Sequence, residues 1–504
     1  MKTLALISAL APQRLTSLDG KPLSQWVDSA LTRALGNIPR LWLHYEGAPF
    51  LDVPEEVKRT VPFEIAGLER TVEKLAEGYD EVLWLEGDEP FIRPDLITRL
   101  VELHRDYHAD YTFADGFPQG LAPEVIHPRI LPTLRKFAEK NALNNPTIEE
   151  KKNIPLRSPW FDLISQDINA FDIETELSPV DLRAERLSFR ADSPRQRLLL
   201  ERWLDEAQGP LQPFLEALRD NPLKRRTLPA TLQLQVTNGV RQVPLWSPLH
   251  HFFPQALSSR DFLEEGKFRE WVSQALDWAG DLTLMPSFWG EPSLHPQIKE
   301  LFLWALTQNN LRLVIETSGL GWRENDLADL AQAAKGRLDW IVELDSQNSQ
   351  TYLRIRGEGF EEAQAFTQKI LQGFSGHVWP QTVRMNETEE ETEGFYRYWK
   401  EQAGQAIILK YNSYGGKLPK RKPADLSPWR RLPCWHLQRD LAVFMDGTVV
   451  PCRDAWKQNL ILGNLHTDSW QSIWEASGRL LQEHAQENYP EVCRNCDEYY
   501  TFFF

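Results

Sequence analysis

The chain contains four cysteines, and all of them lie in its last part: Cys434, Cys452, Cys493 and Cys496. Two residues separate the last pair, so a tight turn can point both sulfurs toward one metal, whereas a disulfide between them would be strained. The two remaining cysteines complete a set of four thiols. The spacing therefore predicts a tetrathiolate site, and by itself it fits a [4Fe–4S] cluster and a zinc ion equally well.

A predicted hairpin brings the first two cysteines together. Asp446-Gly447 lies between two β-prone runs, which favours a type I′ turn in which both turn residues adopt positive φ. Such a hairpin returns Cys452 toward the strand that follows Cys434. The positions of these cysteines are therefore set by local turn chemistry.

A capped helix returns the other two cysteines to the hairpin. Asp468 or Ser469 can cap a helix that runs to about Ala485. The order Cys-x12-Gly-x4-Cys, a gap and Cys-x2-Cys resembles the SPASM domain of radical S-adenosylmethionine (SAM) enzymes. No cysteine follows Cys496, so the segment is similar to the shortened "twitch" form. That resemblance implies one fully ligated auxiliary [4Fe–4S] cluster, suited to electron transfer or to holding the domain together.

The composition is that of an ordinary globular chain of about three domains. Its 504 residues include 56 basic and 72 acidic side chains, a net charge of −16, and they are 42% hydrophobic and 25% charged. This balance argues against a nucleic-acid partner. No run approaches the roughly 18 apolar residues of a membrane span. Residues 1–11 imitate a secretory signal, but the short apolar stretch and Arg14 favour a buried strand, and the sparse cysteines favour the cytoplasm.

Residues 1–145 alternate strands with amphipathic helices, which predicts a three-layer α/β domain with a mostly parallel sheet. The expected strands are Thr3–Ser8, Arg40–His44, Glu81–Glu86 and Tyr111–Ala114, and the expected helices are Leu23–Leu35, Gly67–Gly78 and Arg93–Tyr107. Residues 146–228 contain helix-like stretches without a strand and are expected to form a helical connector.

The first domain contains a candidate nucleotide site. Asp88 follows a strand at the edge where parallel sheets bind ligands, so it could hold a divalent metal against a phosphate. The pattern from Arg14 to Lys21-Pro22, with the following Gly-Asp-x-Pro, resembles the molybdopterin-guanylyltransferase and sugar-nucleotide cytidylyltransferase superfamily. The resemblance implies nucleotidyl or glycosyl transfer with Asp88 and Lys21, although Ser8–Gln13 lacks the glycines of that family's loop. The alternative stays open that Asp88 caps the helix after Pro90 and that Lys21 is a surface residue.

Residues 229–430 predict a partial parallel (β/α)6 barrel whose working face is formed by the carboxyl ends of its strands. The expected strands are Leu232–Val236, Leu282–Phe288, Leu311–Glu316, Trp340–Asp345, Val378–Met385 and Ala406–Tyr411. The helices expected between them are Phe268–Trp278, Gln297–Thr307, Asp326–Ala334, Glu361–Leu371 and Thr392–Glu401.

Short motifs at the predicted strand ends resemble the radical SAM family in order, spacing and placement. They are Gly290-Glu291-Pro292, Glu316–Gly319, Glu343–Ser346 and Tyr352–Gly357. The resemblance implies that Gly290, Glu291 and Pro292 descend from the segment that binds the amino group of SAM. Glu291 has a second interpretation, in which its carboxylate accepts hydrogen bonds from neighbouring backbone.

The defining cysteines of that family are missing. Val240, Pro244 and Ser247 stand where the Cys-x3-Cys-x2-Cys loop would place three thiolates. Neither valine nor proline has a donor for iron, and neutral serine is a poor ligand for a soft centre. We therefore expect a barrel that does not cleave SAM. The alternative is an atypical radical SAM enzyme for peptide or protein modification that recruits its cluster in another way.

Taken together, the motifs resemble the spiro-SPASM family over most of the chain. We expect a nucleotidyltransferase-like domain at 1–145, a connector at 146–228, the barrel at 229–430 and the SPASM or twitch domain at 431–504. The resemblance implies a cytoplasmic iron–sulfur protein whose partner is a redox protein or a polypeptide substrate, with no nucleic-acid or membrane partner.

Overall fold

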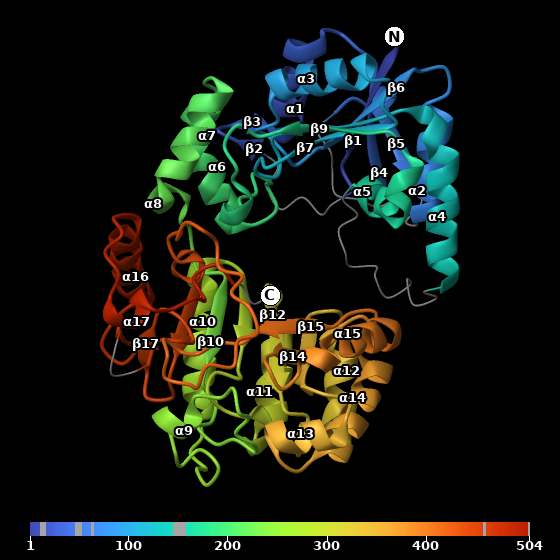
Figure 1. Ribbon diagram of the computed structural model, residues 1–504. Coiled ribbons are helices and arrows are strands. Elements are labelled where there is room, and N and C mark those ends of the chain that lie inside the picture. Colours follow the sequence, from blue (N-terminus) through green and yellow to red (C-terminus); the bar gives the residue numbers. More distant parts are fainter. Residues whose placement is uncertain (11–16, 46–52, 62–64, 145–157, 457–459, 502–504) are drawn as a thin grey trace. The chain divides into compact units, whose positions relative to one another are not determined.

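The computed structural model describes residues 1–10, 17–45, 53–61, 65–144, 158–456 and 460–501. The chain forms two compact units, Met1–Thr227 and Leu228–Phe504. In Figure 1 the first unit runs from blue to green and the second from green to red. Within the described ranges, no helix is long and apolar enough to cross a membrane. The finer division into four segments remains a prediction.

A seven-stranded sheet in the order β5-β4-β1-β6-β8-β7-β9 forms the centre of the first unit. Strand β1 is buried along its whole length and pairs in parallel with β4 and β6, while β8 is antiparallel to its neighbours β6 and β7. The strands are β1 (Thr3–Ser8), β4 (Arg40–Tyr45), β5 (Lys58–Val61), β6 (Glu81–Glu86), β7 (Tyr111–Asp115), β8 (Glu124–Ile126) and β9 (Ile173–Leu177). A small separate ribbon joins β2 (Ser17–Leu18) to β3 (Lys21–Pro22).

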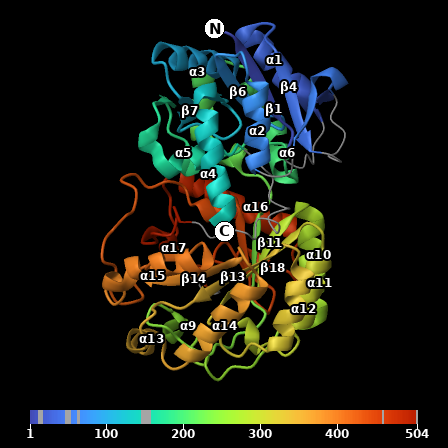
Figure 2. The ribbon, with the colours of Figure 1, turned by 90° about the vertical axis from the view of Figure 1, so that its right-hand side faces the viewer.

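Helices cover both faces of this sheet. Side chains alternate along β1, so Leu4 and Leu6 pack with α2 and α4, whereas Ala5 and Ile7 pack with α1 and α3. Figure 2 shows α2 and α4 side by side. The helices are α1 (Leu23–Leu35), α2 (Ile65–Leu75), α3 (Pro94–Asp106), α4 (Leu131–Asn144) and α5 (Trp160–Ile164). The predicted three-layer α/β architecture is confirmed.

The expectation that residues 146–228 contain no strand is wrong. Strand β9 (Ile173–Leu177) adds to the edge of the sheet and pairs in parallel with β7, with Tyr111 opposite Ile173. In its sequence two glutamates alternate with Ile173, Thr175 and Leu177, and its side chains are partly or fully exposed, so it lacks the apolar run of a buried strand. Three helices follow it: α6 (Pro194–Ala207) and α7 (Leu211–Asp220), which the helix-like stretches predict, and the short additional helix α8 (Pro222–Arg225).

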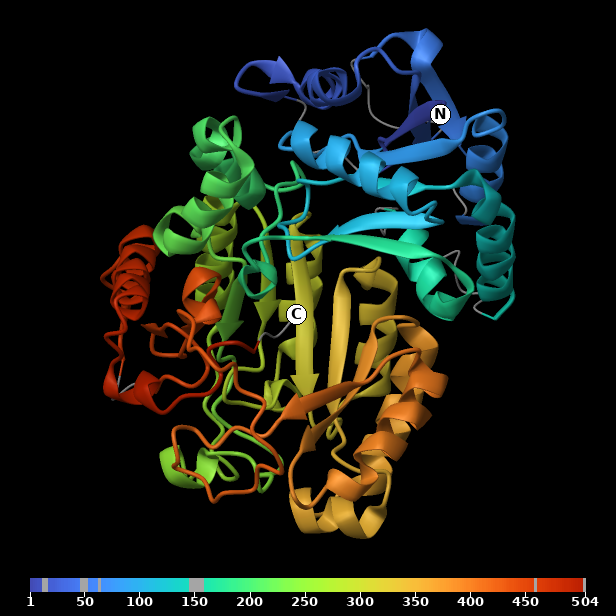
Figure 3. The same ribbon diagram turned by 45° about the horizontal axis from the view of Figure 1, so that its top comes forward.

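The second unit contains six consecutive parallel strands, as the sequence predicts. Their order in the sheet follows the chain from β10 to β15, and Figure 3 shows the green and yellow arrows pointing the same way. The strands are β10 (Thr231–Leu234), β11 (Leu282–Met285), β12 (Leu311–Thr317), β13 (Leu338–Glu343), β14 (Val378–Arg384) and β15 (Ile407–Lys410).

Helices connect these strands and bury their apolar faces against the sheet, with Phe302, Leu330 and Trp340 in one core. All five predicted helices are present, and α9 and α13 are additional. The helices are α9 (Leu249–Phe252), α10 (Glu265–Ala279), α11 (Ile298–Thr307), α12 (Glu324–Ala334), α13 (Ser349–Arg356), α14 (Phe360–Gly373) and α15 (Glu389–Ala403). The carboxyl ends of the six strands consequently share one edge, the barrel mouth.

The cysteine-bearing segment extends the barrel sheet. Strand β16 (Asp440–Val443) pairs in parallel with β10, and β17 (Thr448–Val450) and β18 (Gly463–Asn464) continue the sheet in antiparallel fashion. Helix α16 (Trp470–Ala485) is capped by Ser469, as expected, and a short helix α17 (Glu491–Arg494) follows. The segment that carries the thiols is thereby anchored on the first barrel strand.

The predicted hairpin is present, but its turn differs from the expected type I′ turn. The Phe444 N–H donates to the Thr448 carbonyl at 2.9 Å, which leaves a loop of three residues. Gly447 has φ of +80°, whereas Asp446 does not adopt a positive φ. A three-residue loop with glycine in the left-handed region is the next most common hairpin connection after the two-residue turn.

Candidate metal centre and barrel mouth

The four cysteines line one cavity, although they come from separate elements. Cys434 precedes β16, Cys452 follows β17, Cys493 lies in α17, and Cys496 follows that helix. All four are free thiols, and Cys434 is buried. The predicted hairpin brings Cys434 and Cys452 to this cavity, and the predicted capped helix returns Cys493 and Cys496 to it.

The surroundings of the thiols suit metal ligation. Burial raises the pKa of Cys434 to about 12 and that of Cys493 to about 11, and it also raises the pKa of Cys452 and Cys496. Buried thiols without a cation therefore stay protonated at neutral pH, and a metal compensates their charge when they ionise. The Glu498 N–H already points at the Cys496 sulfur, at 3.3 Å, as a hydrogen bond to a thiolate requires.

Other polar groups complete the wall of this cavity. Arg431 donates to the Cys493 carbonyl and places its guanidinium over the rings of Tyr489 and Tyr499, 4.3 and 4.7 Å from their centroids. Among the residues with described positions, no three His, Cys, Asp or Glu side chains are grouped closely enough to hold a single metal ion. The four thiols therefore line the cavity but do not converge on one metal position.

A second cavity opens at the barrel mouth. Val240, Pro244 and Ser247, which replace the three cysteines of the radical SAM loop, all line it, and so do Gly290 and Glu291. Pro292 begins a short 3-10 turn beside it. The structure therefore gathers the sequence-predicted residues of the mouth at one place.

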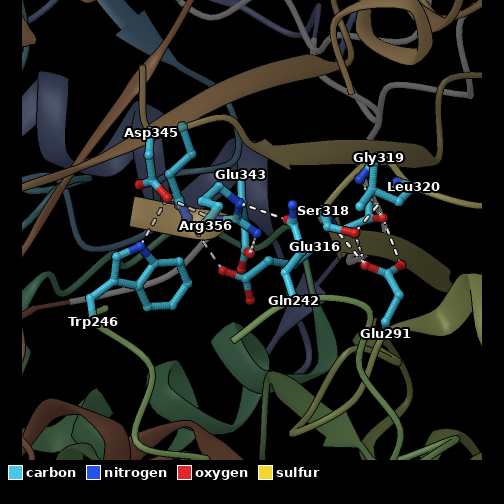
Figure 4. Close-up of polar contacts among 12 residues, drawn as sticks. Gln242, Trp246, Glu291, Glu316, Ser318, Gly319, Leu320, Glu343, Asp345 and Arg356 are labelled. Atoms are coloured by element: carbon cyan, nitrogen blue, oxygen red, sulfur yellow. Dashed lines mark hydrogen bonds and ion pairs between the residues drawn. The ribbon is translucent and has the colours of Figure 1, made fainter. Parts of the chain in front are cut away.

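The Glu291 carboxylate is held by the last residue of β12 and the residue that follows it. It accepts hydrogen bonds from Thr317 Oγ1 at 2.7 Å and from the backbone N–H and hydroxyl of Ser318 at 2.8 and 2.6 Å (Figure 4). These three bonds tie the loop after β11 to the end of β12. They occupy both carboxylate oxygens, in line with the second interpretation of this residue.

Gly290 allows two loops to approach each other closely. A Cβ atom at this position would lie 1.8 Å from the carbonyl oxygen of Thr237, in the loop after β10. Because the obstacle is backbone, a side chain cannot be accommodated by a change of rotamer. The glycine of this motif therefore has a packing role that the sequence does not reveal.

Arg356 organises the charges on the other side of the mouth. Its guanidinium contacts Asp345 and Glu343, each at 2.8 Å, and Gln242 at 3.0 Å, and Trp246 donates to Asp345 at 2.9 Å (Figure 4). Burial raises the pKa of Glu343 to about 7 although Arg356 opposes the shift. The sequence motifs include Glu343, Asp345 and Arg356, but they do not predict that these side chains form ion pairs with one another.

The two cavities share two wall residues, Arg453 and Glu498. Arg453 follows Cys452 directly and forms an ion pair with Glu316 at 2.6 Å. Glu498 pairs with Lys410, which also lies 3.1 Å from Asp497. The sequence analysis did not predict that the two cavities share wall residues. A signal was available, because the charged residues Arg453 and Glu498 lie within two residues of Cys452 and Cys496.

The structure does not bring Asp88 and Lys21 to one described cavity. Asp88 is buried in the turn after β6, and its carbonyl accepts from the Ala191 N–H at 2.8 Å. It does not cap α3, because that helix begins at Pro94 and Arg93 precedes it. Lys21 is exposed and lies 5.0 Å from the ring of Trp26. Arg14, the remaining residue of the motif, lies outside the described residues.

Comparisons with known proteins agree with this organisation. Residues 434–497 match the SPASM family, an iron–sulfur cluster-binding domain. The chain is therefore an α/β protein with a C-terminal iron–sulfur cluster-binding domain. An uncharacterized protein of Treponema pallidum (strain Nichols) is 34% identical over 357 residues, which cover 68% of this chain and 98% of that protein. The chain belongs to the same family as that protein.

Solved structures show weaker likenesses. Streptococcus suis SuiB bound to precursor peptide SuiA matches with 12% identity and a TM-score of 0.42, covering 56% of this chain and 71% of that one. A cytidylyltransferase from Leptospira borgpetersenii serovar Hardjo-bovis matches with 13% identity and a TM-score of 0.34, covering 44% of this chain and 95% of that one.

Proposed function

We propose that the chain binds one [4Fe–4S] cluster through Cys434, Cys452, Cys493 and Cys496 and uses it for electron transfer. The observation that carries the proposal is that the four thiols line one cavity inside the segment that matches the SPASM domain. Four thiolates saturate such a cluster and leave no open iron, which suits electron transfer better than substrate activation. A bound cluster would supply the electron, and the four cysteines would hold the cluster.

The position of the site suggests where the electron goes. Arg453 and Glu498 form part of the wall of both the cysteine cavity and the mouth cavity. A molecule bound at the mouth would therefore lie next to the cluster. We propose a redox protein or a polypeptide as that partner, and a barrel that does not cleave SAM because Val240, Pro244 and Ser247 replace the cluster cysteines.

Anaerobic purification with metal analysis and a visible spectrum tests the cluster. We expect a brown protein with about four irons and four sulfides per chain. A colourless protein with about one zinc ion would replace the cluster by a zinc tetrathiolate. About eight irons would instead support the atypical radical SAM enzyme, because a second cluster would then be present.

SAM turnover tests the barrel separately. The reduced, iron-loaded protein is incubated with SAM, and 5′-deoxyadenosine is measured by mass spectrometry. We expect none above a control without protein. Its formation in proportion to protein concentration would contradict the proposal that the barrel lost this reaction, whatever the cluster analysis shows.

We propose nucleotide binding by the first unit as a second function. Lys21, Trp26 and Arg33 line a groove together with Arg93, whose guanidinium is paired with Asp95 at 3.1 Å. Lys21 and Arg33 are the two cations beside the indole. Two cations and an indole ring suit a phosphate attached to a base. Calorimetry with nucleoside triphosphates and Mg²⁺ tests the function. Loss of binding in Lys21→Ala and in Arg33→Ala would support it, and the absence of binding by the wild type would remove it.

A further inference from the structure

Helix α16 carries a buried histidine that the proposed cysteine ligation does not use. His484 is 2% exposed and lies on the apolar face that also contains Leu480 and Leu481. Neither of its ring nitrogens has a hydrogen-bond partner among the described residues. A buried polar group normally has a partner, and leaving one without costs about 1–3 kcal/mol. A leucine would fit the pattern of this helix better, so the histidine calls for an explanation.

The surroundings of His484 indicate what its partner is. The ring lines the cavity that the four cysteine thiols surround. A second side chain of the same cavity has one unpartnered buried donor, Arg431 Nε, although its other nitrogens donate to the carbonyls of Cys493 and Arg494. Donor atoms of two side chains, His484 and Arg431, thus lack partners at the wall of one cavity. This points to an occupant with hydrogen-bond acceptors of its own.

The charge state of the His484 ring indicates that it acts as a neutral hydrogen-bond donor. Burial, with a smaller contribution from Arg431, lowers the pKa of His484 to about 4. The imidazole is therefore neutral at pH 7 and carries one N–H donor. Tyr489 contacts the ring edge-on, with the centroids 4.9 Å apart, and limits its movement. The residue offers a fixed neutral donor beside the thiols.

We propose that His484 donates a hydrogen bond to a sulfur of the cluster and thereby raises the cluster's reduction potential. The inference rests on the proposed function, because it needs an iron–sulfur cluster in the cavity. Sulfur atoms of such clusters accept hydrogen bonds, and these bonds are one of the established controls of the potential. Reduction adds negative charge to the cluster, so a donor at its sulfur stabilises the reduced form more than the oxidised form.

Potentiometric titration of the full chain, followed by visible absorption, tests the inference. In His484→Leu we expect unchanged iron and sulfide content and a more negative midpoint potential, by up to the 59 mV that corresponds to a tenfold change in a one-electron equilibrium. His484→Gln retains an N–H donor and should restore most of the potential. The free energy of unfolding of iron-free His484→Leu should not fall, because leucine replaces an unpartnered polar group.

Ser477→Ala is the matched control, because Ser477 is also buried and unpartnered on α16 but does not line the cavity. Its potential should equal that of the wild type.

If His484→Leu does not fold, pulsed EPR of the reduced wild type with ¹⁵N-labelled histidine must show a weak coupling that His484→Gln alters. An unchanged potential in an iron-loaded His484→Leu, or an unaltered coupling, overturns the inference and leaves the cluster intact. An iron-free wild type overturns both.

Discussion

Arg453 Nη2 lies 2.6 Å from the carboxylate of Glu316, and this ion pair joins the residue after Cys452, a proposed cluster ligand, to the end of a barrel strand. The Glu316 side chain is 8% exposed and that of Arg453 is 20% exposed. Because β16 also pairs with β10, the cysteine segment is held on the barrel by a strand and by a charge. The proposed cluster site and the barrel mouth are consequently held in a fixed position relative to each other.

The first prediction concerns this ion pair. Replacing Arg453 with methionine leaves the Glu316 carboxylate without its cation in a largely buried place, which should lower the free energy of unfolding of the second unit by about 3 kcal/mol. Urea denaturation of the full chain at pH 7 measures the loss. The double variant Arg453→Met, Glu316→Met should lose less than the sum of the two single variants, and strict additivity would show that the two side chains do not interact.

The second prediction concerns the packing of Gly290. Gly290→Ala places a Cβ 1.8 Å from the Thr237 carbonyl, so the loops after β10 and β11 must separate. We expect a loss of about 3 kcal/mol of unfolding free energy, at the upper end of the usual cost of overpacking a core, because the obstacle is backbone. Gly394→Ala is the control, since Gly394 lies inside α15 with open space around it, and it should gain about 0.5–1 kcal/mol. Equal melting temperatures for Gly290→Ala and the wild type would contradict the packing role.

The elements that bring the cysteines together could be predicted because their signals are local. The Asp446-Gly447 turn and the Ser469 cap each act within a few residues of the chain, and both are present. The exact turn was not predictable, because whether Asp446 adopts positive φ depends on the length of the loop rather than on the dipeptide alone. The prediction that the four cysteines share one site rested only on these local signals and on the count of four cysteines, and the ligand set itself remains a prediction.

The contacts at the mouth could not be predicted because they join residues far apart in the sequence. Arg453 and Glu316 are separated by 137 residues, and Gln242 and Arg356 by 114. The sequence places each side chain near a strand end but does not say which opposite charge it meets. His484 is a similar case, since helical periodicity assigns it to the buried face without indicating that a cavity lies there.

The third prediction is a pH dependence in the first unit. Burial raises the pKa of Glu86 from 4.5 to about 8, and the charges of Glu89 and Asp88 add to the shift. A raised carboxyl pKa means that the unfolded state loses its proton first, so stability is full below about pH 4.5, falls as the pH rises, and is lowest above about pH 8. Glu86→Gln removes this slope.

Hydrogen exchange of strand β6 in the full chain measures this effect at its own site. Relative to the wild type, Glu86→Gln should protect β6 by a few kcal/mol more at about pH 8.5 and by almost nothing at about pH 4.5. The Gln side chain can still accept from Trp84 and from the Ser158 N–H, which now hold the carboxylate at 3.1 and 2.9 Å. An equal difference at both values of pH would show that Glu86 does not titrate in this range.

The fourth prediction concerns removal of the metal. Cys434 leads into β16 and Cys452 follows β17, so a bound centre joins both ends of the hairpin. Anaerobic chelation of iron should therefore speed hydrogen exchange in β16 and β17 by about tenfold or more, because binding energy of the metal contributes directly to local stability. Since β16 pairs with β10, the increase should reach β10 as well.

Strands β13 and β14 and the first unit serve as internal controls, because none of them pairs with β16, β17 or β18 in the described sheets. Their exchange should stay within experimental error after chelation. Cys493→Ser, which removes one ligand without a chelator, should give the same pattern with greatly reduced iron content. If chelation bleaches the protein while β16 and β17 exchange as before, the cluster is present but the hairpin does not depend on it, and the strand pairing with β10 alone holds the segment.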